Sequence, residues 1–318
     1  MCRTAVFLGE ALASYGFGAN HPLGNDRMYA FEKKLMSEKV PSLIVEQPEI
    51  ASEDQVLTFH DKSYVEFVKM ASRRGGVLLD RGDTPAFKGV FEAALYTVGS
   101  TLAALECVIT GRDKSGNAIE HAFNPIGGLH HAMRESASGF CVFNDIGIAI
   151  LAARSQHDIK RVAYVDIDAH HGDGVFYEFE DDPLLFFADI HEDGRHLFPG
   201  TGYPDETGKG AAAGTKLNIP VEPGAGDDRF VTEFERIEKF IDEARPELII
   251  LQCGADSLGG DPIAHLQFSA KAHRHAADVL HRLAHKHCSS RIIGLGGGGY
   301  NRDNIGAAWT EVVKSFAS

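Results

Sequence analysis

Hydrophobic positions along this chain follow two alternating patterns. Seven short apolar runs, rich in β-branched and aromatic residues, are typical of buried strands and cover residues 4–8, 120–124, 161–167, 184–190, 215–221, 247–254 and 291–297. Longer segments with helical periodicity cover residues 25–37, 61–73, 85–110, 144–156, 228–244, 269–287 and 302–316. Apolar strands that alternate with helices predict a mostly parallel sheet covered on both faces. We therefore predict an α/β fold, a single-domain three-layer αβα arrangement over residues 1–318.

Composition and charge narrow the class of protein. The 318 residues are 44% hydrophobic, and 45 acidic against 31 basic residues give a net charge of -14. Direct binding to nucleic acid is not expected, because neutralising phosphates requires clustered Lys and Arg. The five cysteines contain no CxxC pair, and the N-terminal residues lack a signal-like pattern. Because no apolar run approaches the roughly 18 residues of a membrane span, we expect a cytoplasmic protein without membrane contact.

Four polar clusters directly follow predicted strands: "PIGGLHHAMRESASGF", "DIDAHHGDG", "GADSLGGDP" and "GGGGYN". Parallel sheets bind ligands beyond the carboxyl ends of their strands, so these clusters are expected to meet. In extended "DIDAH", side chains 166, 168 and 170 face one way, and their burial is costly unless they are paired or bind a metal. Together with Asp256, the pair Asp168 and His170 forms a ligand set that leaves an open coordination position on a divalent cation. Oxygen and nitrogen ligands of this kind bind both Zn²⁺ and Fe²⁺. A hydrogen-bonded network without metal is the alternative.

Acid–base chemistry is predicted for the tandem histidines. His130 and His131 follow two glycines, in a turn that lets both rings enter one pocket. Imidazoles beside an activated water are suited to act as general base and general acid. Asp166 and Asp173 can each accept from the far ring nitrogen and fix the tautomer. Two surface histidines in a glycine-rich turn are the alternative.

Aromatic residues complete the candidate site. Tyr300, on the open backbone of "GLGGGGYN", can donate a hydrogen bond to an oxyanion. This glycine run lacks the Gly-Lys-Ser/Thr of a phosphate loop and a following βαβ unit. Phe140 and Phe198 either belong to the core or form the walls of a narrow apolar channel.

These motifs, in this order, resemble those of the zinc-dependent histone deacetylase family of the arginase–deacetylase superfamily, especially its bacterial acetoin-utilisation-type members. The resemblance runs from "HPLGNDRM" to "GGGGYN" and rests on "GGLHHA", "ASGFCVFND", "VDIDAHHGDG", "HLFPGTG" and "GADSLGGDP". It implies the arginase–deacetylase fold and zinc bound by Asp168, His170 and Asp256. It also implies catalysis by five residues: His130, His131, Asp166, Asp173 and Tyr300.

The resemblance implies further binding sites. A substrate channel would be formed by Asp83 at its rim, by Gly139, Phe140, Phe198 and Ile263 along it, and by Arg27 at an inner acetate-release cavity. Structural potassium would lie beside Asp166, Asp168, His170, Asp189 and Ile190, and a second potassium beside Phe179, Asp182 and Leu185. Two positions depart from a common family pattern: Asp189 replaces a serine, and Leu129 replaces an aromatic residue.

The implied reaction is hydrolysis of the acetyl amide of N-ε-acetyl-lysine in proteins. An acetylpolyamine amidohydrolase, acting on small acetylated amines, is the close alternative, because the negative net charge suits cationic substrates of both kinds. An arginase-like ureohydrolase is disfavoured because Gly172 stands where a second metal requires Asp. A module that only binds acetyl-lysine is disfavoured because every expected catalytic residue is present. The physiological substrate, the acyl-chain preference and the oligomeric state stay open.

Overall fold

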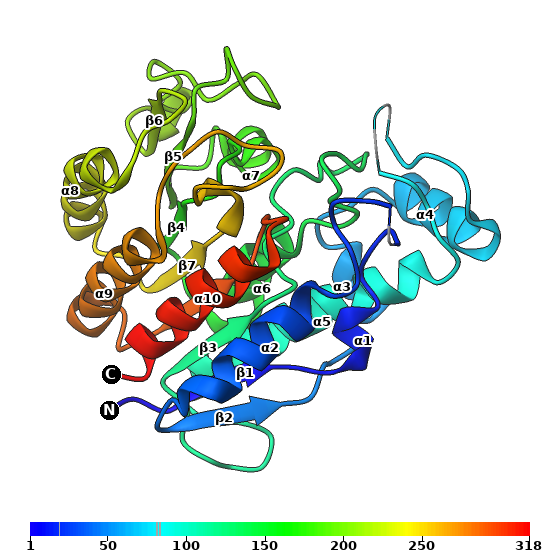
Figure 1. Ribbon diagram of the computed structural model, residues 1–318, viewed down its shortest axis with the longest axis horizontal. Helices are drawn as coiled ribbons and strands as arrows, with labels where there is room; N and C mark the ends of the chain where they lie inside the picture. Colours follow the sequence, from blue (N-terminus) through cyan, green and yellow to red (C-terminus); the bar gives the residue numbers. More distant parts are fainter. Residues whose placement is uncertain (19, 81, 83) are drawn as a thin grey trace.

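The computed structural model describes residues 1–18, 20–80, 82 and 84–318. Within these residues the strands form one eight-stranded sheet with the order β2-β1-β3-β8-β7-β4-β5-β6, and every strand pairing is parallel (Figure 1). The strands are β1 (Thr4–Phe7), β2 (Leu43–Glu46), β3 (His121–Asn124), β4 (Val162–Asp166), β5 (Leu185–Glu192), β6 (Lys216–Val221), β7 (Leu248–Gln252) and β8 (Ile292–Leu295). The seven predicted strands are present. The sequence pattern missed β2, a short and half-exposed strand at the edge of the sheet.

Helices cover both faces of this sheet and make it the middle of three layers. The α-helices are α1 (Glu10–Ala13), α2 (Arg27–Glu38), α3 (Glu53–Val56), α4 (Lys62–Arg74), α5 (Val90–Thr110), α6 (Asp145–His157), α7 (Asp173–Phe176), α8 (Asp227–Ala244), α9 (Ala270–His287) and α10 (Arg302–Phe316). Short 3₁₀ segments are η1 (Tyr177–Phe179), η2 (Gly210–Ala212) and η3 (Ala255–Ser257). Helices α8, α9, α10 and α2 follow one another across one face, whereas α5 and α6 pack together on the other (Figure 1). This is the predicted three-layer αβα fold.

Helix α5 is long and apolar enough, by length and composition, to cross a membrane. The expectation that no apolar run reaches this length is therefore wrong for Val90–Thr110. The helix packs against the sheet and α6, and two-thirds of its most apolar window is buried inside the protein. Its composition is that of a core helix, which is apolar on nearly all sides because it is surrounded by protein.

Side-chain caps set where two helices begin after functional loops. The side chain of Asn144 accepts a hydrogen bond from the backbone N–H of Gly147 at 2.8 Å and starts α6. Asn301 accepts from the N–H of Asp303 at 3.0 Å and starts α10 directly after the glycine-rich loop. Such caps satisfy N–H groups that have no partner within the helix. They therefore fix the ends of the loops that carry His131 and Tyr300.

The four polar clusters of the sequence follow the four central strands of the sheet. These strands, β3, β8, β7 and β4, are consecutive neighbours. In the register, Asp166 at the end of β4 stands between Gln252 of β7 and Asp189 of β5. Because all strands run in the same direction, their carboxyl ends lie at one edge. The topology therefore brings the clusters together, as predicted.

Candidate active site

Three buried side chains from two loops form a compact ligand set. One ligand atom each from Asp168, His170 and Asp256 lies within 4.8 Å of the others. Nδ1 of His170 is 3.1 Å from Oδ1 of Asp168 and 3.3 Å from Oδ2 of Asp256. This last oxygen is buried and has no hydrogen-bond partner among the described residues. Burial and the neighbouring Asp168 carboxylate raise the pKa of Asp256 to about 7. Two crowded carboxylates with an unpaired oxygen fit a divalent cation, whose charge offsets their repulsion.

Backbone and amide donors hold this ligand set in place. Gln252 Nε2 and the N–H of Gly298 both donate to Oδ2 of Asp168 at 2.8 Å. A Cβ at Gly298 would lie 2.0 Å from Oδ2 of Asp256, and one at Gly254 would lie 1.9 Å from Oδ2 of Asp168. Only glycine allows the backbone this close to the carboxylates. Sequence reasoning missed Gln252, although one amide at the end of the apolar run "LIILQ" was a usable signal.

The tandem histidines lie side by side beside the ligand set, with ring centroids 4.0 Å apart. Nδ1 of His130 is 2.8 Å from Oδ2 of Asp166, and Nδ1 of His131 is 2.6 Å from Oδ1 of Asp173. Each carboxylate therefore orients one ring and leaves Nε2 as the nitrogen available to a substrate. Burial, and then the neighbouring His130, lowers the pKa of His131. A neutral imidazole in this position can accept a proton.

The region around Asp166 leaves no room for a further carboxylate. The Tyr164 hydroxyl and the N–H of Asp168 both donate to the Asp166 carboxylate. A Cβ at Gly172 would lie 2.8 Å from Oδ2 of Asp166 and 3.3 Å from Nδ1 of His130. Any side chain at position 172 would therefore collide with the His130–Asp166 pair. This steric limit disfavours a bridged pair of metals of the ureohydrolase kind.

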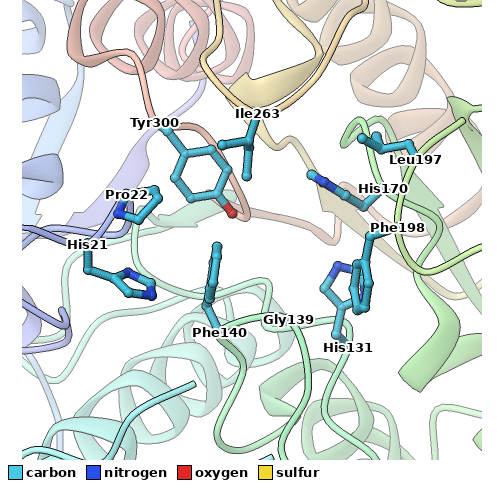
Figure 2. A pocket seen from close by; sticks show the side chains of 10 residues that line it. All are labelled: His21, Pro22, His131, Gly139, Phe140, His170, Leu197, Phe198, Ile263 and Tyr300. Atoms are coloured by element: carbon cyan, nitrogen blue, oxygen red, sulfur yellow. The ribbon is translucent and has the colours of Figure 1, made fainter. Parts of the chain in front are cut away.

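A cavity of about 340 Å³ leads to these groups (Figure 2). It is lined by His21, Pro22, His131, Gly139, Phe140, His170, Leu197, Phe198, Ile263 and Tyr300. Figure 2 shows the Tyr300 hydroxyl pointing into the cavity, with His170 and His131 across from it. Burial, followed by the Asp256 and Asp168 carboxylates, raises the pKa of Tyr300 well above its ordinary value. The phenol therefore stays protonated and is a hydrogen-bond donor.

Apolar and glycine residues narrow this cavity. Phe140 has a positive φ of 67°, and hydrogen bonds from the Tyr15 hydroxyl to its carbonyl and from its N–H to Thr84 Oγ1 hold it there. A Cβ at Gly139 would lie 2.4 Å from Cδ2 of His131 and 3.0 Å from Cε1 of Phe198. Phe140 is buried and Phe198 is 49% exposed. Both residues line the cavity, and Phe198 is the more solvent-exposed of the two.

Arg27 supports the glycine-rich loop from within the protein. Its buried guanidinium donates to the carbonyls of Gly299 at 2.9 Å and Gly297 at 2.5 Å. It lies 6.0 Å from the ring centroid of Tyr300 and 5.3 Å from that of Trp309. Its contacts are therefore with the loop that carries Tyr300. Asp83, expected at the rim, lies outside the described residues.

Residues expected around the first potassium form a buried polar group. The carboxylate of Asp189 accepts from the N–H of Gly172 at 2.8 Å and lies 2.8 Å from Nδ1 of His191. Ile190, the next residue of β5, is fully buried. Both oxygens of the Asp189 carboxylate therefore contact neighbouring protein groups. The sequence analysis did not predict these contacts.

A lysine lies where the second potassium was expected. Nζ of Lys216 donates to the carbonyls of Asp182 at 2.9 Å and Leu185 at 2.7 Å, and to Oγ1 of Thr215 at 2.8 Å. The carbonyl of Phe179 accepts from the N–H of Asp182 at 3.1 Å. An ammonium group of the chain itself therefore contacts two of the three residues expected around that ion. Sequence reasoning missed this buried lysine.

Comparisons with known proteins agree with one another. Residues 21–316 match the model of the histone deacetylase domain. The acetoin utilization protein AcuC of Bacillus subtilis strain 168 is 36% identical over 99% of this chain and 81% of its own length. Histone deacetylase clr6 of Schizosaccharomyces pombe is 32% identical over 97% of this chain and 75% of its own. The crystal structure of the HDA15 HD domain superposes with a TM-score of 0.89 at 26% identity, covering 100% of this chain and 90% of the other.

Proposed function

Because this chain belongs to the histone deacetylase family, a family of metal-dependent hydrolases, we propose that it hydrolyses the acetyl amide of N-ε-acetyl-lysine in proteins. Residues 1–318 would form one catalytic domain. The observation that carries it is the convergence of three groups on one cavity. These groups are the ligand set with Asp168, the carboxylate-supported histidine pair, and the protonated hydroxyl of Tyr300.

Asp168, His170 and Asp256 would bind the metal ion, which we propose to be zinc, with ferrous iron as the alternative. When bound, such an ion would lower the pKa of its water ligand to about 7 and polarise a carbonyl. The donors from Gln252 and Gly298 keep Asp168 in position for this role. This position matters because a misplacement of about 1 Å in an active site can lower the rate of the reaction by about 10²-fold.

The histidine pair moves the protons of the reaction. One imidazole accepts a proton from the attacking water, and one delivers a proton to the lysine amine as it leaves. Nδ1 of each ring is held by a carboxylate, Asp166 or Asp173, so the proton moves at Nε2. When one ring accepts a proton it becomes positively charged, and the buried carboxylates of Asp166 and Asp173 offset this charge. Such positioned acid–base groups contribute about 10² to 10⁴ in rate.

Tyr300 stabilises the oxygen of the acetyl carbonyl as negative charge develops on it. Its hydroxyl points into the cavity, and its raised pKa keeps the proton available for donation (Figure 2). Backbone geometry supports this placement, because the N–H of Tyr300 donates to Oδ2 of Asp261 at 2.8 Å. Arg27 holds the preceding glycines by their carbonyls.

The shape of the cavity supports a lysine side chain as the substrate. Gly139, Phe140 and Phe198 leave a narrow apolar passage that suits four methylene groups. Ile263 and Leu197 extend this apolar lining. An acetylated amide at the end of such a chain reaches the ligand set, while the substrate backbone stays outside near the half-exposed Phe198.

The test compares two substrates under metal control. Hydrolysis of a fluorogenic acetyl-lysine peptide and of N-acetylputrescine is measured with chelator, and again after Zn²⁺ or Fe²⁺ is returned. Chelator-sensitive turnover that strongly favours the peptide is expected. Preference for N-acetylputrescine would instead assign the same site to small acetylated amines. Turnover of neither substrate by any metal form would overturn the proposal.

A further inference from the structure

The chain holds a second cluster of metal-binding side chains, at the edge of the sheet opposite the candidate active site. Cys2 precedes β1, His121 is the first residue of β3, and His281 and His285 lie on α9. The groups of the candidate active site instead follow the carboxyl ends of the strands. Figure 1 shows the N-terminus close to the C-terminus that follows α10. Residues far apart in the sequence thus meet at the amino ends of the strands.

The four side chains converge on one point. One ligand atom from each of Cys2, His121, His281 and His285 lies within 4.8 Å of the others. Sγ of Cys2 is 3.8 Å from Nε2 of His281 and 3.6 Å from Nε2 of His285. The ring centroid of His121 is 4.7 Å from that of His281 and 5.3 Å from that of His285. Four donor atoms at these separations surround a space suited to one ion.

His121 supplies independent evidence for a ligand. Its side chain is fully buried, and neither ring nitrogen has a hydrogen-bond partner in the part of the chain that the structure describes. A buried polar group without a partner destabilises a fold, so such groups call for an explanation such as a bound ion. The histidine ring faces the three other donors of the cluster. A metal ion there would satisfy one of its two ring nitrogens.

A hydrogen bond from outside the cluster orients one of its rings. Nδ1 of His285 is 2.9 Å from Oγ of Ser290, which leaves Nε2 directed toward Cys2. Metal binding would displace the proton of the Cys2 thiol, because the thiolate is the form that ligates metals.

The two histidines on α9 make the cluster accessible to an ion from solvent. His281 and His285 are four residues apart on α9, so they lie on the same face of the helix. His285 is exposed to solvent and His281 is half-buried, whereas Cys2 and His121 are buried. An ion can therefore enter from the α9 side and reach the buried donors.

We propose that Cys2, His121, His281 and His285 bind a transition-metal ion of the zinc class in tetrahedral coordination. One thiolate and three imidazoles form a ligand set that zinc prefers, and four protein ligands leave no open position. The site is therefore structural, not catalytic. It ties the residue before β1 to β3 and α9, and it does not depend on the activity proposed above.

Co²⁺ is the probe that separates this site from the candidate active site. A thiolate bound to Co²⁺ absorbs in the near ultraviolet by charge transfer, and the ligand set of Asp168, His170 and Asp256 contains no sulfur. The metal-free full chain, with a free N-terminus and any tag at the C-terminus, is titrated with Co²⁺. A thiolate charge-transfer band that saturates at one equivalent for this site is expected. The band should persist in Asp256→Asn.

Further variants complete the test. Cys2→Ser should abolish the band, and His285→Gln, at the exposed position, should weaken Co²⁺ binding at least tenfold. Cys288→Ser removes another buried thiol, which donates to the Pro246 carbonyl, and should keep the band. Added Zn²⁺ should raise the Tm of Asp256→Asn but not that of the Asp256→Asn, Cys2→Ser double variant. Absence of the band in the wild-type chain, or its survival in Cys2→Ser, would overturn the proposal.

Discussion

Nδ1 of His131 lies 2.6 Å from Oδ1 of Asp173, and both residues are buried beside the cavity. The carboxylate also accepts from the N–H of Gly174 at 3.0 Å, so its own position is fixed by the backbone. The ring orientation of His131 therefore depends on a residue 42 positions later in the chain.

Asp173→Asn should lower kcat by about 10²-fold or more, with a much smaller change in KM. The amide no longer compensates an imidazolium and can hold the wrong tautomer of His131. Steady-state hydrolysis of an acetyl-lysine peptide measures both constants. The exposed Asp181→Asn serves as the control for the same chemical change and should retain wild-type kinetics. An unchanged kcat in Asp173→Asn would remove Asp173 from the proposed mechanism.

Tyr300→Phe should reduce kcat by about 10² to 10³, the usual loss for one oxyanion donor. The ring remains to pack against Phe140, with centroids 5.8 Å apart, so the fold and the cavity should be preserved. Tyr203→Phe, which removes a hydroxyl from a side chain that is 40% exposed, is the matched control. Wild-type turnover in Tyr300→Phe would show that the hydroxyl does not stabilise the developing charge.

Gly139→Ala should block the channel while leaving the protein folded. The new methyl group would lie 2.4 Å from Cδ2 of His131, and the φ of 51° adds strain. We expect kcat/KM to fall by at least 10²-fold, because a misplaced catalytic group of this kind costs about that much. Gly210→Ala has nearly the same φ, 54°, with no heavy atom within 4 Å, so it isolates the backbone strain. Equal losses in both variants would contradict the steric explanation.

Gln252→Leu should weaken metal binding at the active site by about 10- to 100-fold, as loss of an outer hydrogen bond to a ligand typically does. The amide donates to Oδ2 of Asp168, and leucine has a similar volume but no donor. Competition with a chromophoric chelator measures the affinity, in a Cys2→Ser background so that the second cluster does not contribute. The exposed Gln156→Leu should bind metal as the background chain does. An unchanged affinity would mean that Gln252 does not position Asp168.

Lys216 should make the free energy of unfolding depend on pH. Burial lowers its pKa from 10.5 to about 8 in the folded protein. Between pH 8 and 10.5 the unfolded chain therefore binds more protons than the folded one, so stability from this group rises with pH. The contribution of Lys216 to the free energy of unfolding is greatest above about pH 10.5 and is lost as pH falls through 8. We expect the difference in unfolding free energy between wild type and Lys216→Met to increase across this window.

Urea unfolding at pH 7 to 11 measures that difference. At pH 7, Lys216→Met also leaves two carbonyls, of Asp182 and Leu185, without their ammonium donor, which should cost about 1 to 3 kcal/mol for each unsatisfied group. The exposed Lys239→Met is the control, since its side chain lies at the surface of α8. A difference that stays constant with pH would show that the pKa of Lys216 is not lowered on folding.

Local patterns in the chain predicted most of the fold and the central part of the site. The near-continuous apolar run of β4 predicted a buried parallel strand, and the polar residues after it predicted a ligand set that includes Asp168 and His170. Strand β2 was missed because only four residues, partly exposed, carry its signal. Polar residues such as Thr97 and Thr101 interrupt the apolar run of α5 in the sequence, yet both are buried in the structure.

Residues that act through distant partners could not be read from neighbouring positions. Gln252 and Lys216 each look like one polar residue in a strand, and their roles depend on contacts with chain segments more than 30 residues away. The cluster with Cys2 is a stronger case, because its donors come from positions 2, 121, 281 and 285. No local spacing reports such a set, apart from the four-residue interval on α9.

The sequence by itself determined the class of fold, the order of the elements and the chemical types of the active-site groups, because periodicity and strand-end motifs are local properties. The tertiary structure decided which carboxylate pairs with which histidine, how closely the glycine backbone approaches Asp168, and that the Lys216 ammonium contacts the carbonyls of Asp182 and Leu185. It also brought the four donors around Cys2 together. These outcomes depend on the parallel strand order, which places residues hundreds of positions apart within a few ångströms of one another.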